Sequence, residues 1–323
     1  MAKILVTGGA GFLGTHLVAQ LVKRGDEVRS YSRSHPETPA DGVEYRQGDI
    51  RDGDAVDAAV EGMDTVVHLV SNFRSAASDS EAHSINVDGT NNVLLSAVRH
   101  HVKRLVHTST IGVHGSVLDI PANEQTAFNP GDAYQETKLV AEQRVWEVYR
   151  DTGLPISVVR PISLIGPGDE RMLKLFKMIK KRRFFMVGDG AALFQPAYVD
   201  DVVAGFLLCM EKEEAVGESF ILGGDEYIPL VQLVAMIAEE FDVAPPGVRI
   251  PMGPMKLMAD VCEAIFSPLG IEPPLHHRRL SFYRNNRAFT IEKARNLLGF
   301  EPRVSLREGL QRTIHWYEEN GWL

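Results

Sequence analysis

A tyrosine and a lysine stand four residues apart in the segment Tyr134-Gln135-Glu136-Thr137-Lys138. On a helix, side chains at positions i and i+4 lie on the same face, one turn apart. A free phenol titrates near a pKa of about 10, and a cation held beside it favours the phenolate. Such a tyrosine could give a proton to a forming alkoxide or take one from an alcohol. Taken alone the pair is a weak signal, because any surface helix can carry one.

Hydroxyl side chains follow a short apolar run that ends at Thr108. The run, residues 104–108, predicts a strand, and Ser109 and Thr110 come directly after it. Residues at the carboxyl end of a central strand lie over the ligand crevice of an open α/β sheet. One of these hydroxyls could hydrogen-bond a substrate carbonyl and orient it for hydride attack. The alternative is that they only form a turn.

A glycine-rich turn near the N-terminus predicts a binding site for a dinucleotide. An apolar run over residues 3–7 ends in Gly8-Gly9-Ala10-Gly11-Phe12-Leu13-Gly14, and a helical pattern follows at once. The spacing fits two templates, G-x-G-x-x-G from Gly9 and G-x-x-G-x-x-G from Gly8. Glycines let the backbone approach a pyrophosphate closely, and the helix start offers it unpaired N–H groups. The alternative is a turn that merely packs a strand on a helix.

Alternating strand and helix patterns, from residue 3 to about 160, position these groups. The further predicted strands cover 27–32, 43–47, 65–70 and 156–160, and helices follow Asp52 and cover about 84–100 and 132–151. Strands separated by helices imply right-handed crossovers and a parallel sheet. We therefore predict an α/β fold with a doubly wound parallel Rossmann sheet over residues 1–160, to which a later segment at about 190–215 returns. Residues 161–323 are expected to form mostly a smaller, partly discontinuous substrate-binding subdomain, because prolines and glycines interrupt the pattern there.

Composition narrows the classes of function. The chain has 323 residues, of which 44% are hydrophobic and 24% charged, as in ordinary globular proteins. The net charge of −9 and the lack of a long basic tract argue against a nucleic-acid partner. The one short basic run, residues 180–183, is predicted to end a helix, where cations suit the helix dipole.

Cysteines, histidines and termini give no sign of a disulfide framework, a metal site or export. Cys209 and Cys262 lie in apolar helical patterns and are expected to be reduced thiols of the core. The eleven histidines show no metal-ligand spacing. The chain enters a strand directly, and no uninterrupted apolar run could span a bilayer, so we expect a cytoplasmic protein.

An amphipathic helix rich in methionine and phenylalanine is predicted over residues 254–269. Packing within the smaller subdomain is the favoured interpretation. The alternative is a flexible apolar lid or an element that contacts a membrane surface, because methionine adapts to irregular apolar partners.

Along nearly its whole length the chain resembles the extended short-chain dehydrogenases/reductases, the superfamily of NAD-dependent epimerases and dehydratases. The matching pieces, besides the glycine-rich turn and the Tyr134–Lys138 pair, are Gly48-Asp49-Ile50, Asn86-Val87-Asp88-Gly89-Thr90-Asn91-Asn92-Val93, Ser109-Thr110, Arg160-Pro161, Gly166-Pro167-Gly168-Asp169 and Tyr198-Val199-Asp200-Asp201. The family usually shows Val-Tyr-Gly where this chain has Val113-His114-Gly115, which is a small departure.

The resemblance implies roles for individual residues. Tyr134 is then the acid/base, Lys138 holds the nicotinamide ribose and lowers the pKa of the tyrosine, and Thr110 positions the substrate oxygen. His68, inside its strand, is expected to be structural, and helices 84–100 and 132–151 would form the usual dimer interface. Asp49 and Ile50 would border the adenine. The full set of residues expected to bind the cofactor is Gly8, Gly11, Phe12, Leu13, Gly14, Ser32, Arg33, Ser34, Asp49, Ile50, Leu69, Val70, Ser71, Thr108, Tyr134, Lys138, Pro161 and Ser163.

The end of the second predicted strand indicates which cofactor is used. An acid at that position binds the ribose hydroxyls of NAD, but here the residue is Ser32, followed by Arg33 and Ser34. A serine leaves room for a 2′-phosphate, and an arginine can pair with it through two hydrogen bonds. We predict a preference for NADP(H), with NAD(H) as the alternative if Arg33 is only a solvated loop cation.

The C-terminal half of the chain indicates which class of substrate is bound. Nucleotide-sugar members commonly have an arginine before the Tyr-Val-Asp-Asp segment, whereas residues 190–198 contain none and Leu193 and Phe194 suit an apolar ligand. The rear also resembles the 3β-hydroxysteroid and sterol-4-carboxylate dehydrogenase branch and its 3-oxo-acid reductase relatives. The pieces are Glu272-Pro273-Pro274-Leu275, Phe289-Thr290-Ile291-Glu292-Lys293-Ala294-Arg295 and Leu298-Gly299-Phe300-Glu301-Pro302.

The resemblance implies an oxidoreductase that interconverts a secondary alcohol and a ketone on a hydrophobic substrate, either sterol-like or a long-chain 3-oxo acid. One alternative is a nucleotide-sugar epimerase, dehydratase or reductase. A further alternative is a non-catalytic NAD(P)-binding scaffold, which the presence of Thr110, Tyr134 and Lys138 together makes the least favoured.

Overall fold

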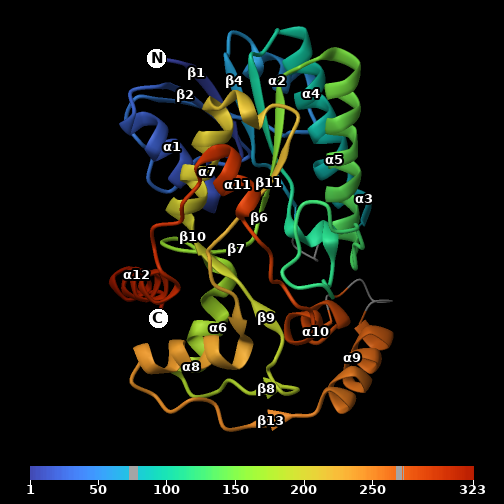
Figure 1. Ribbon diagram of the computed structural model, residues 1–323, viewed down its shortest axis with the longest axis vertical. Coiled ribbons are helices and arrows are strands. Elements are labelled where there is room, and N and C mark those ends of the chain that lie inside the picture. Colours follow the sequence, from blue (N-terminus) through green and yellow to red (C-terminus); the bar gives the residue numbers. More distant parts are fainter. Residues whose placement is uncertain (73–78, 267–270, 272) are drawn as a thin grey trace.

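A seven-stranded parallel sheet forms the upper part of the molecule in Figure 1, a computed structural model that describes residues 1–72, 79–266, 271 and 273–323. Its strands are β1 (Lys3–Thr7), β2 (Glu27–Ser32), β3 (Val43–Gln47), β4 (Thr65–His68), β5 (Arg104–Thr108), β6 (Ile156–Pro161) and β11 (Ser219–Leu222). They lie in the order β11-β6-β5-β4-β1-β2-β3, and all six neighbouring pairs are parallel. The structure confirms the predicted strands, except that β4 ends two residues earlier than expected and β6 one residue later.

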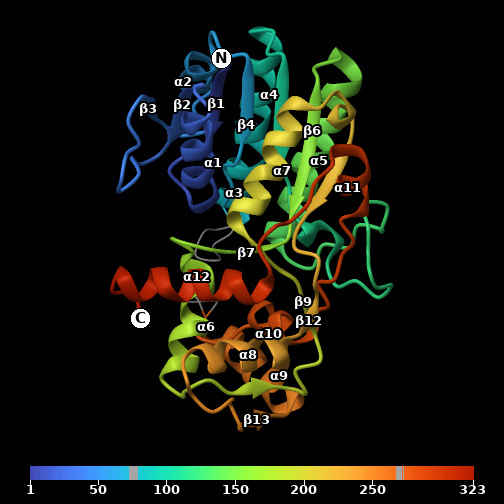
Figure 2. The same cartoon turned by 60° about the vertical axis from the view of Figure 1, so that its left-hand side comes forward.

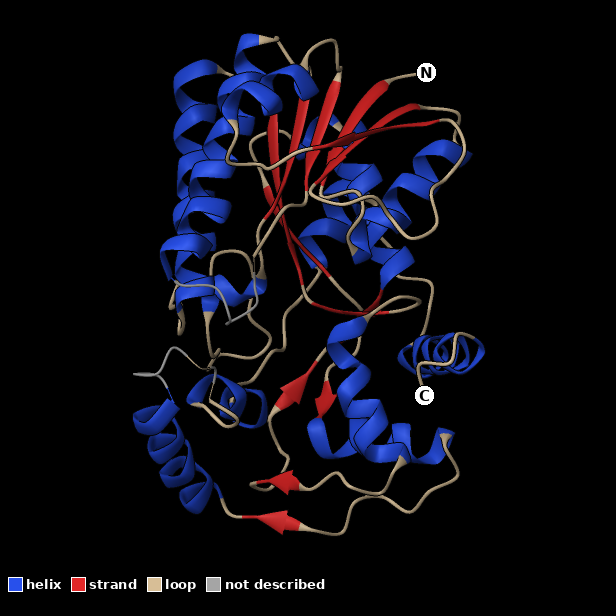
Figure 3. Ribbon diagram, turned by 180° about the vertical axis from the view of Figure 1, so that it is seen from behind, coloured by secondary structure: helices blue, strands red, loops and turns tan. Residues whose placement is uncertain are grey.

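Helices cover both faces of this sheet, as Figure 3 shows from behind. Successive strand residues point to opposite faces. Ile4 and Val6 of β1 therefore join the core that contains α1 (Phe12–Lys23) and α7 (Val199–Glu211). Leu5 joins the core beneath α2 (Gly53–Val60), α4 (Gly89–Arg99) and α5 (Ala133–Thr152). The predicted doubly wound α/β fold is confirmed.

The helix that carries the Tyr134–Lys138 pair has defined ends. Asp132 precedes α5, and its Oδ1 accepts a hydrogen bond of 2.9 Å from the Gln135 amide, which satisfies one of the free N–H groups of the first turn. Gly153 ends the helix in the left-handed conformation with φ of 70°. The predicted helix over 132–151 is thus confirmed to within one residue.

The helical run before β5 begins earlier than expected. It consists of α3 (Asp79–His83), a π-helical turn over Ser84–Asp88 and then α4. π-helical turns are rare, and they often lie at functional sites.

The lower part of the molecule is built from later segments of the chain. Its helices are α6 (Glu170–Lys180), α8 (Leu230–Glu240), α9 (Met252–Phe266), α10 (His277–Arg284) and α12 (Leu306–Glu319), and its short strands are β7 (Ser163–Ile165), β8 (Met186–Val187), β9 (Leu193–Phe194), β10 (Pro196–Tyr198), β12 (Ile228–Pro229) and β13 (Arg249–Ile250). Helix α12 lies across the middle of the molecule, against β7, β10 and α8 (Figure 2). The chain returns to the sheet through α7 and β11, and again through α11 (Glu292–Leu298), which packs on α7 and β11.

Helix α9 begins two residues before the predicted helix, and residues 267–269, like Glu272, lie outside the described part of the chain. On its inner side Met255 and Ala259 pack with Val187 and Leu280. Leu257, Val261 and Ile265, spaced four residues apart, remain half or more exposed. One face therefore packs as expected, and the other is an uncovered apolar stripe. Among the described residues, no helix has the length and apolar character needed to span a bilayer.

The two cysteines differ in their surroundings. Cys209 is completely buried in α7, and burial raises the pKa of its thiol to about 12. Cys262 on α9 is only half-buried. Both are free thiols, as expected, but only Cys209 belongs to a core.

Candidate active site

The glycine-rich turn connects β1 to α1 and leaves a cradle beside the first turn of the helix. Gly8 has a φ of 76°, a conformation that suits glycine, and the Gly11 amide donates a hydrogen bond of 3.0 Å to its carbonyl. A side chain at Gly14 would collide with the Gly8 carbonyl oxygen and approach the Gly9 Cα to 2.7 Å. The helix can therefore pack this closely only with glycine at that position. The turn has the shape required to hold a pyrophosphate at a helix N-terminus.

Two cavities open beside this turn. The larger, about 520 Å³, lies between the glycine-rich turn, the end of β5, the start of α5 and the loop after α10. The smaller, about 250 Å³, lies over the ends of β2 and β4, and both are lined by Gly8, Gly11, Leu69 and Ser71. Such a pair of cavities, which share lining residues at the carboxyl ends of the strands, suits the two halves of a dinucleotide.

Every residue of the predicted cofactor set, and Thr110, lines one of the two cavities, whereas Leu193 and Phe194, which were expected to suit an apolar ligand, line neither. On the larger lie Phe12, Leu13, Gly14, Thr108, Thr110, Tyr134, Lys138, Pro161 and Ser163, and on the smaller lie Ser32, Arg33, Ser34, Asp49, Ile50 and Val70. The structure thus brings the predicted residues together, while the binding of a cofactor to them remains a prediction.

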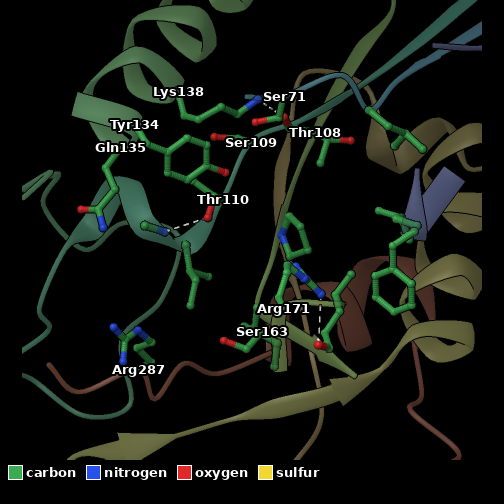
Figure 4. A pocket seen from close by; sticks show the side chains of 18 of the residues that line it. Ser71, Thr108, Ser109, Thr110, Tyr134, Gln135, Lys138, Ser163, Arg171 and Arg287 are labelled. Atoms are coloured by element: carbon green, nitrogen blue, oxygen red, sulfur yellow. Dashed lines mark hydrogen bonds between the residues drawn. The ribbon is translucent and has the colours of Figure 1, made fainter. Parts of the chain in front are cut away.

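Tyr134 and Lys138 lie on one side of α5 and face the larger cavity (Figure 4). The Lys138 side chain is only 1% exposed, and its Nζ donates a hydrogen bond of 2.6 Å to the Thr108 carbonyl. The Tyr134 phenol lies close to the side chains of Ser71 and Thr110, which line the same cavity. The phenol thus lies between the end of β5 and the loop after β4, where a substrate carbonyl could reach it.

The pKa shifts of Tyr134 and Lys138 differ from what the resemblance implied. Burial raises the pKa of the Tyr134 phenol, whereas the polar side chains of Ser71 and Thr110 and the charge of Arg171 act in the opposite direction. Lys138 was expected to lower this pKa, but its ammonium group is directed at the Thr108 carbonyl. Burial also lowers the pKa of Lys138 to about 8, against the opposing effect of Glu142. Tyr134 therefore holds its proton at neutral pH and is suited to act as an acid.

A buried ion pair between Glu142 and Arg160 lies near Lys138. Glu142 is one helical turn further along α5, and its Oε2 accepts a hydrogen bond of 3.1 Å from Arg160 Nε. Both side chains are at most 3% exposed. Arg160 also contacts His114 Nε2 at 3.2 Å, so the histidine that replaces the family's tyrosine packs on this ion pair. An unpaired charge is costly to bury, so Glu142 and Arg160 stabilise each other in these positions.

The walls of the cofactor groove are fixed by buried polar contacts. Asn86, in the π-helical turn, accepts a hydrogen bond of 2.7 Å from the Asn72 amide and donates one of 2.9 Å to Thr137 on α5. It thereby ties the loop that carries Ser71 to the helix that carries Tyr134. His68 contacts the hydroxyls of Thr7 and Thr90 at 2.7 and 3.0 Å, and burial lowers its pKa to about 3. His68 is a neutral buried residue that links two strands and a helix.

The smaller cavity carries its positive charge at the end of β2. The Ser32 hydroxyl accepts a hydrogen bond of 3.1 Å from the Ala10 amide, which places it beneath the glycine-rich turn. Asp49 pairs with Arg51 at 2.6 Å, and this hydrogen bond lowers the pKa of Asp49 to about 2. Arg33 is exposed at the rim. Among the described residues, Asp49 is the acidic side chain on this cavity, and it is already neutralised by an arginine.

Two arginines that were not predicted from the sequence also line the larger cavity. Arg171, at the start of α6, pairs with the buried Asp169 at 2.8 Å and lies 5.2 Å from the Phe12 ring. Its position two residues after the end of the Gly-Pro-Gly-Asp piece was a usable signal. Arg287 follows α10, and no motif around it points to a site. It reaches the cavity only because its amide donates a 2.9 Å hydrogen bond to the Leu193 carbonyl.

Comparison with known proteins identifies the type of protein. Residues 4–223 match the model of the NAD dependent epimerase/dehydratase family. A 2-alkyl-3-oxoalkanoate reductase of Stenotrophomonas maltophilia is 32% identical, over 96% of this chain and 98% of the relative. A 3 beta-hydroxysteroid dehydrogenase/Delta 5-->4-isomerase of Mycobacterium tuberculosis is also 32% identical, over 98% of this chain and 90% of the relative.

A solved structure with a bound cofactor has the same fold. The dTDP-glucose 4,6-dehydratase of Streptomyces venezuelae, in complex with NAD and TYD, superposes with a TM-score of 0.81 at 26% identity, and the match covers 99% of this chain and 98% of that one. The likeness extends over the sheet and the lower part of the molecule alike.

Proposed function

Because the chain belongs to the NAD-dependent epimerase/dehydratase family, we propose that it is an oxidoreductase that interconverts a secondary alcohol and a ketone on a hydrophobic substrate. The observation that carries this proposal is the Tyr134 phenol, which lies in a cavity bordered by the glycine-rich turn and close to the Thr110 and Ser71 side chains. The names of the two relatives support the type of reaction, since both describe enzymes of ketone or alcohol chemistry.

Three polar side chains of the site have a task in this reaction. The nicotinamide dinucleotide, when bound in the groove, supplies or accepts the hydride. Thr110 orients the substrate carbonyl oxygen by a hydrogen bond. Tyr134 gives its proton to the oxygen as the alkoxide forms, or takes the proton from the alcohol in the reverse direction. Lys138 places a positive charge beside the site and stays fixed on the Thr108 carbonyl.

The preferred cofactor in this proposal is NADP(H). Ser32 and Arg33 stand where an NAD-specific member would have an acid, and the Asp49 carboxylate is paired with Arg51. Among the residues that the structure describes there, a 2′-phosphate would thus meet an exposed guanidinium and no unpaired carboxylate. The family name and the NAD-bound neighbour support the binding of a nicotinamide dinucleotide in general. The residues at the end of β2, Ser32 and Arg33, support the form with a 2′-phosphate.

A nucleotide-sugar epimerase, dehydratase or reductase is the second candidate, favoured by the likeness to the dTDP-glucose dehydratase. An epimerase or dehydratase would keep its cofactor bound and cause no net oxidation. A non-catalytic scaffold is the least supported, because Thr110, Tyr134 and Lys138 all face one cavity.

Measurement of cofactor oxidation separates these candidates. Purified protein would be mixed with NADPH or NADH and with long-chain 3-oxo acids, sterol ketones or nucleotide sugars. The proposal expects stoichiometric cofactor oxidation with at least one hydrophobic ketone. Conversion of a nucleotide sugar without net oxidation, together with no turnover of hydrophobic ketones, would contradict it.

Two surfaces complete the proposal. The outer faces of α4 and α5 carry the half-exposed Leu95 and Val140, and we assign them to a homodimer interface. The apolar stripe of Leu257, Val261 and Ile265 on α9 suits contact with a membrane surface, the alternative that the sequence left open beside packing in the smaller subdomain.

A further inference from the structure

Arg287 faces the larger cavity from the side opposite Tyr134 (Figure 4). Two hydrogen bonds fix the chain segment around Arg287. The Arg287 amide donates to the Leu193 carbonyl, and the Phe289 amide donates a hydrogen bond of 2.8 Å to Gln195 Oε1. The guanidinium lies 5.6 Å from the centre of the Phe194 ring. The position of this charge is therefore set by fixed backbone and a buried aromatic ring.

The hydrogen bonds of the guanidinium are long. Its Nη1 and Nη2 lie 3.3 to 3.5 Å from the carbonyls of Asn285, Phe282 and Ser281, at the end of α10. Ordinary N–H···O bonds measure about 2.7–3.2 Å. Nε takes no part in these contacts. The helix end therefore satisfies this arginine weakly and leaves donors for another partner.

The charges around the cavity leave Arg287 without an ion-pair partner. Arg171 is paired with Asp169, and Lys138 lies one turn from Glu142 on α5. Within the described part of the chain, no carboxylate forms an ion pair with Arg287. Asp132 also lines the cavity, but one of its oxygens caps α5. Burial lowers the pKa of Arg287 to about 10, against the effect of Asp132, so the guanidinium is charged at neutral pH.

We infer that Arg287 binds the carboxylate of the substrate, so that the enzyme acts on a 3-oxo or 3-hydroxy acid rather than on a neutral sterol. A planar guanidinium can hold a carboxylate by two parallel hydrogen bonds, and the bound anion would supply the missing counter-charge. The ketone of the acid is then reduced at Tyr134 and Thr110, which line the same cavity as Arg287. This inference rests on the proposed function and narrows its substrate class.

A matched pair of substrates tests the inference. A long-chain 3-oxo acid and its methyl ester have the same ketone and chain and differ in the carboxylate charge. The wild type would be compared with Arg287→Met and Arg287→Lys, and with Arg284→Met as the control, because Arg284 is an exposed arginine at the end of the same helix. Melting temperature and NADPH affinity would be measured for each variant.

The expected result is selective. Arg287→Met should lower kcat/KM for the acid by about 30-fold or more, the effect of losing a charge-assisted hydrogen bond, and change that for the ester less than about 3-fold. Arg287→Lys should recover part of the loss, and Arg284→Met should match the wild type. The loss should lie mainly in KM.

Two results would overturn the inference while leaving the proposed function intact. One is an equal loss for acid and ester in Arg287→Met, which would make Arg287 only a cap of α10. The other is a wild type that reduces the ester or a sterol ketone as well as the acid. A wild type that reduces no hydrophobic ketone would instead contradict the proposed function itself.

Discussion

The Lys138 ammonium group donates a hydrogen bond of 2.6 Å to the backbone carbonyl of Thr108, at the end of the central strand β5. This bond ties the first turns of α5 to the sheet at the point where the predicted reaction takes place. It also means that the ammonium group is held by the backbone and is almost completely removed from water. Its charge is therefore sensitive to pH in a range where lysine is normally fully protonated.

The pH dependence of ketone reduction should report on Lys138. Its pKa is lowered to about 8, so the side chain is charged below that pH and loses its charge as the pH rises through it. The Tyr134 pKa is raised, so the phenol keeps its proton over the same range. We expect kcat/KM for reduction to decline above a pH of about 8.

Lys138→Arg should remove this decline, because a guanidinium remains charged throughout. Initial rates across the pH range, for both proteins, make the measurement. A wild-type profile that is flat up to a pH of about 10, the ordinary lysine range, would show that Lys138 does not govern the rate. An unchanged decline in the variant would show the same.

Gly14→Ala should abolish cofactor binding. The added methyl group would collide with the Gly8 carbonyl and push α1 away from the turn. Gly53→Ala is the matched control, since a methyl group there meets only the Asn92 side chain at 3.6 Å. Titration calorimetry with NADPH would show binding to the control and none to Gly14→Ala. Undiminished affinity in Gly14→Ala would mean that the cofactor does not use this turn.

Cofactor preference should depend on the two residues at the end of β2. Arg33→Ala should lower kcat/KM with NADPH by about 10- to 100-fold, the value of a charge-assisted phosphate contact, and leave NADH little affected. Ser32→Asp should act in the same direction, because its carboxylate would repel a 2′-phosphate and accept the ribose hydroxyls. Equal effects on both cofactors, or a wild type that prefers NADH, would refute the assignment.

The dimer proposal predicts the effect of charges on α4 and α5. Leu95→Glu together with Val140→Glu should convert a dimer to a monomer, because both side chains are more than 40% exposed in the single chain and would be buried between copies. Leu118→Glu, which alters a side chain that is 89% exposed and belongs to neither helix, is the control. Sedimentation equilibrium gives the mass of each. A monomeric wild type would rule out this interface.

Much of the fold was predictable because its signals are local. Strands β2, β3 and β5 have the predicted bounds, and Asp132 and Gly153 mark the ends of α5 in the sequence itself. The glycine-rich turn is similarly explicit, since Gly14 tolerates no side chain. The Tyr134–Lys138 pair needed only a helix to place both residues on one face.

The rest depends on contacts between distant parts of the chain. The backbone of Arg287 is held by a hydrogen bond to Leu193, which lies 94 positions earlier in the chain. No local sequence pattern predicts this contact. The absence of an arginine in residues 190–198 suggested an apolar site, yet Arg287 stands over Phe194. The pKa of Tyr134 was also misjudged, because burial is a property of the folded cavity and the spacing to Lys138 does not reveal it.

Hydride transfer in Tyr134→Phe tests the central claim most directly. The variant keeps the ring and removes only the hydroxyl that faces Thr110 and Ser71 in the cavity. In a single-turnover experiment with NADPH and a reducible ketone, we predict that cofactor affinity stays within about 3-fold of the wild type while reduction falls by about 100-fold or more, as for loss of a general acid. Reduction at the wild-type rate by Tyr134→Phe would contradict the account.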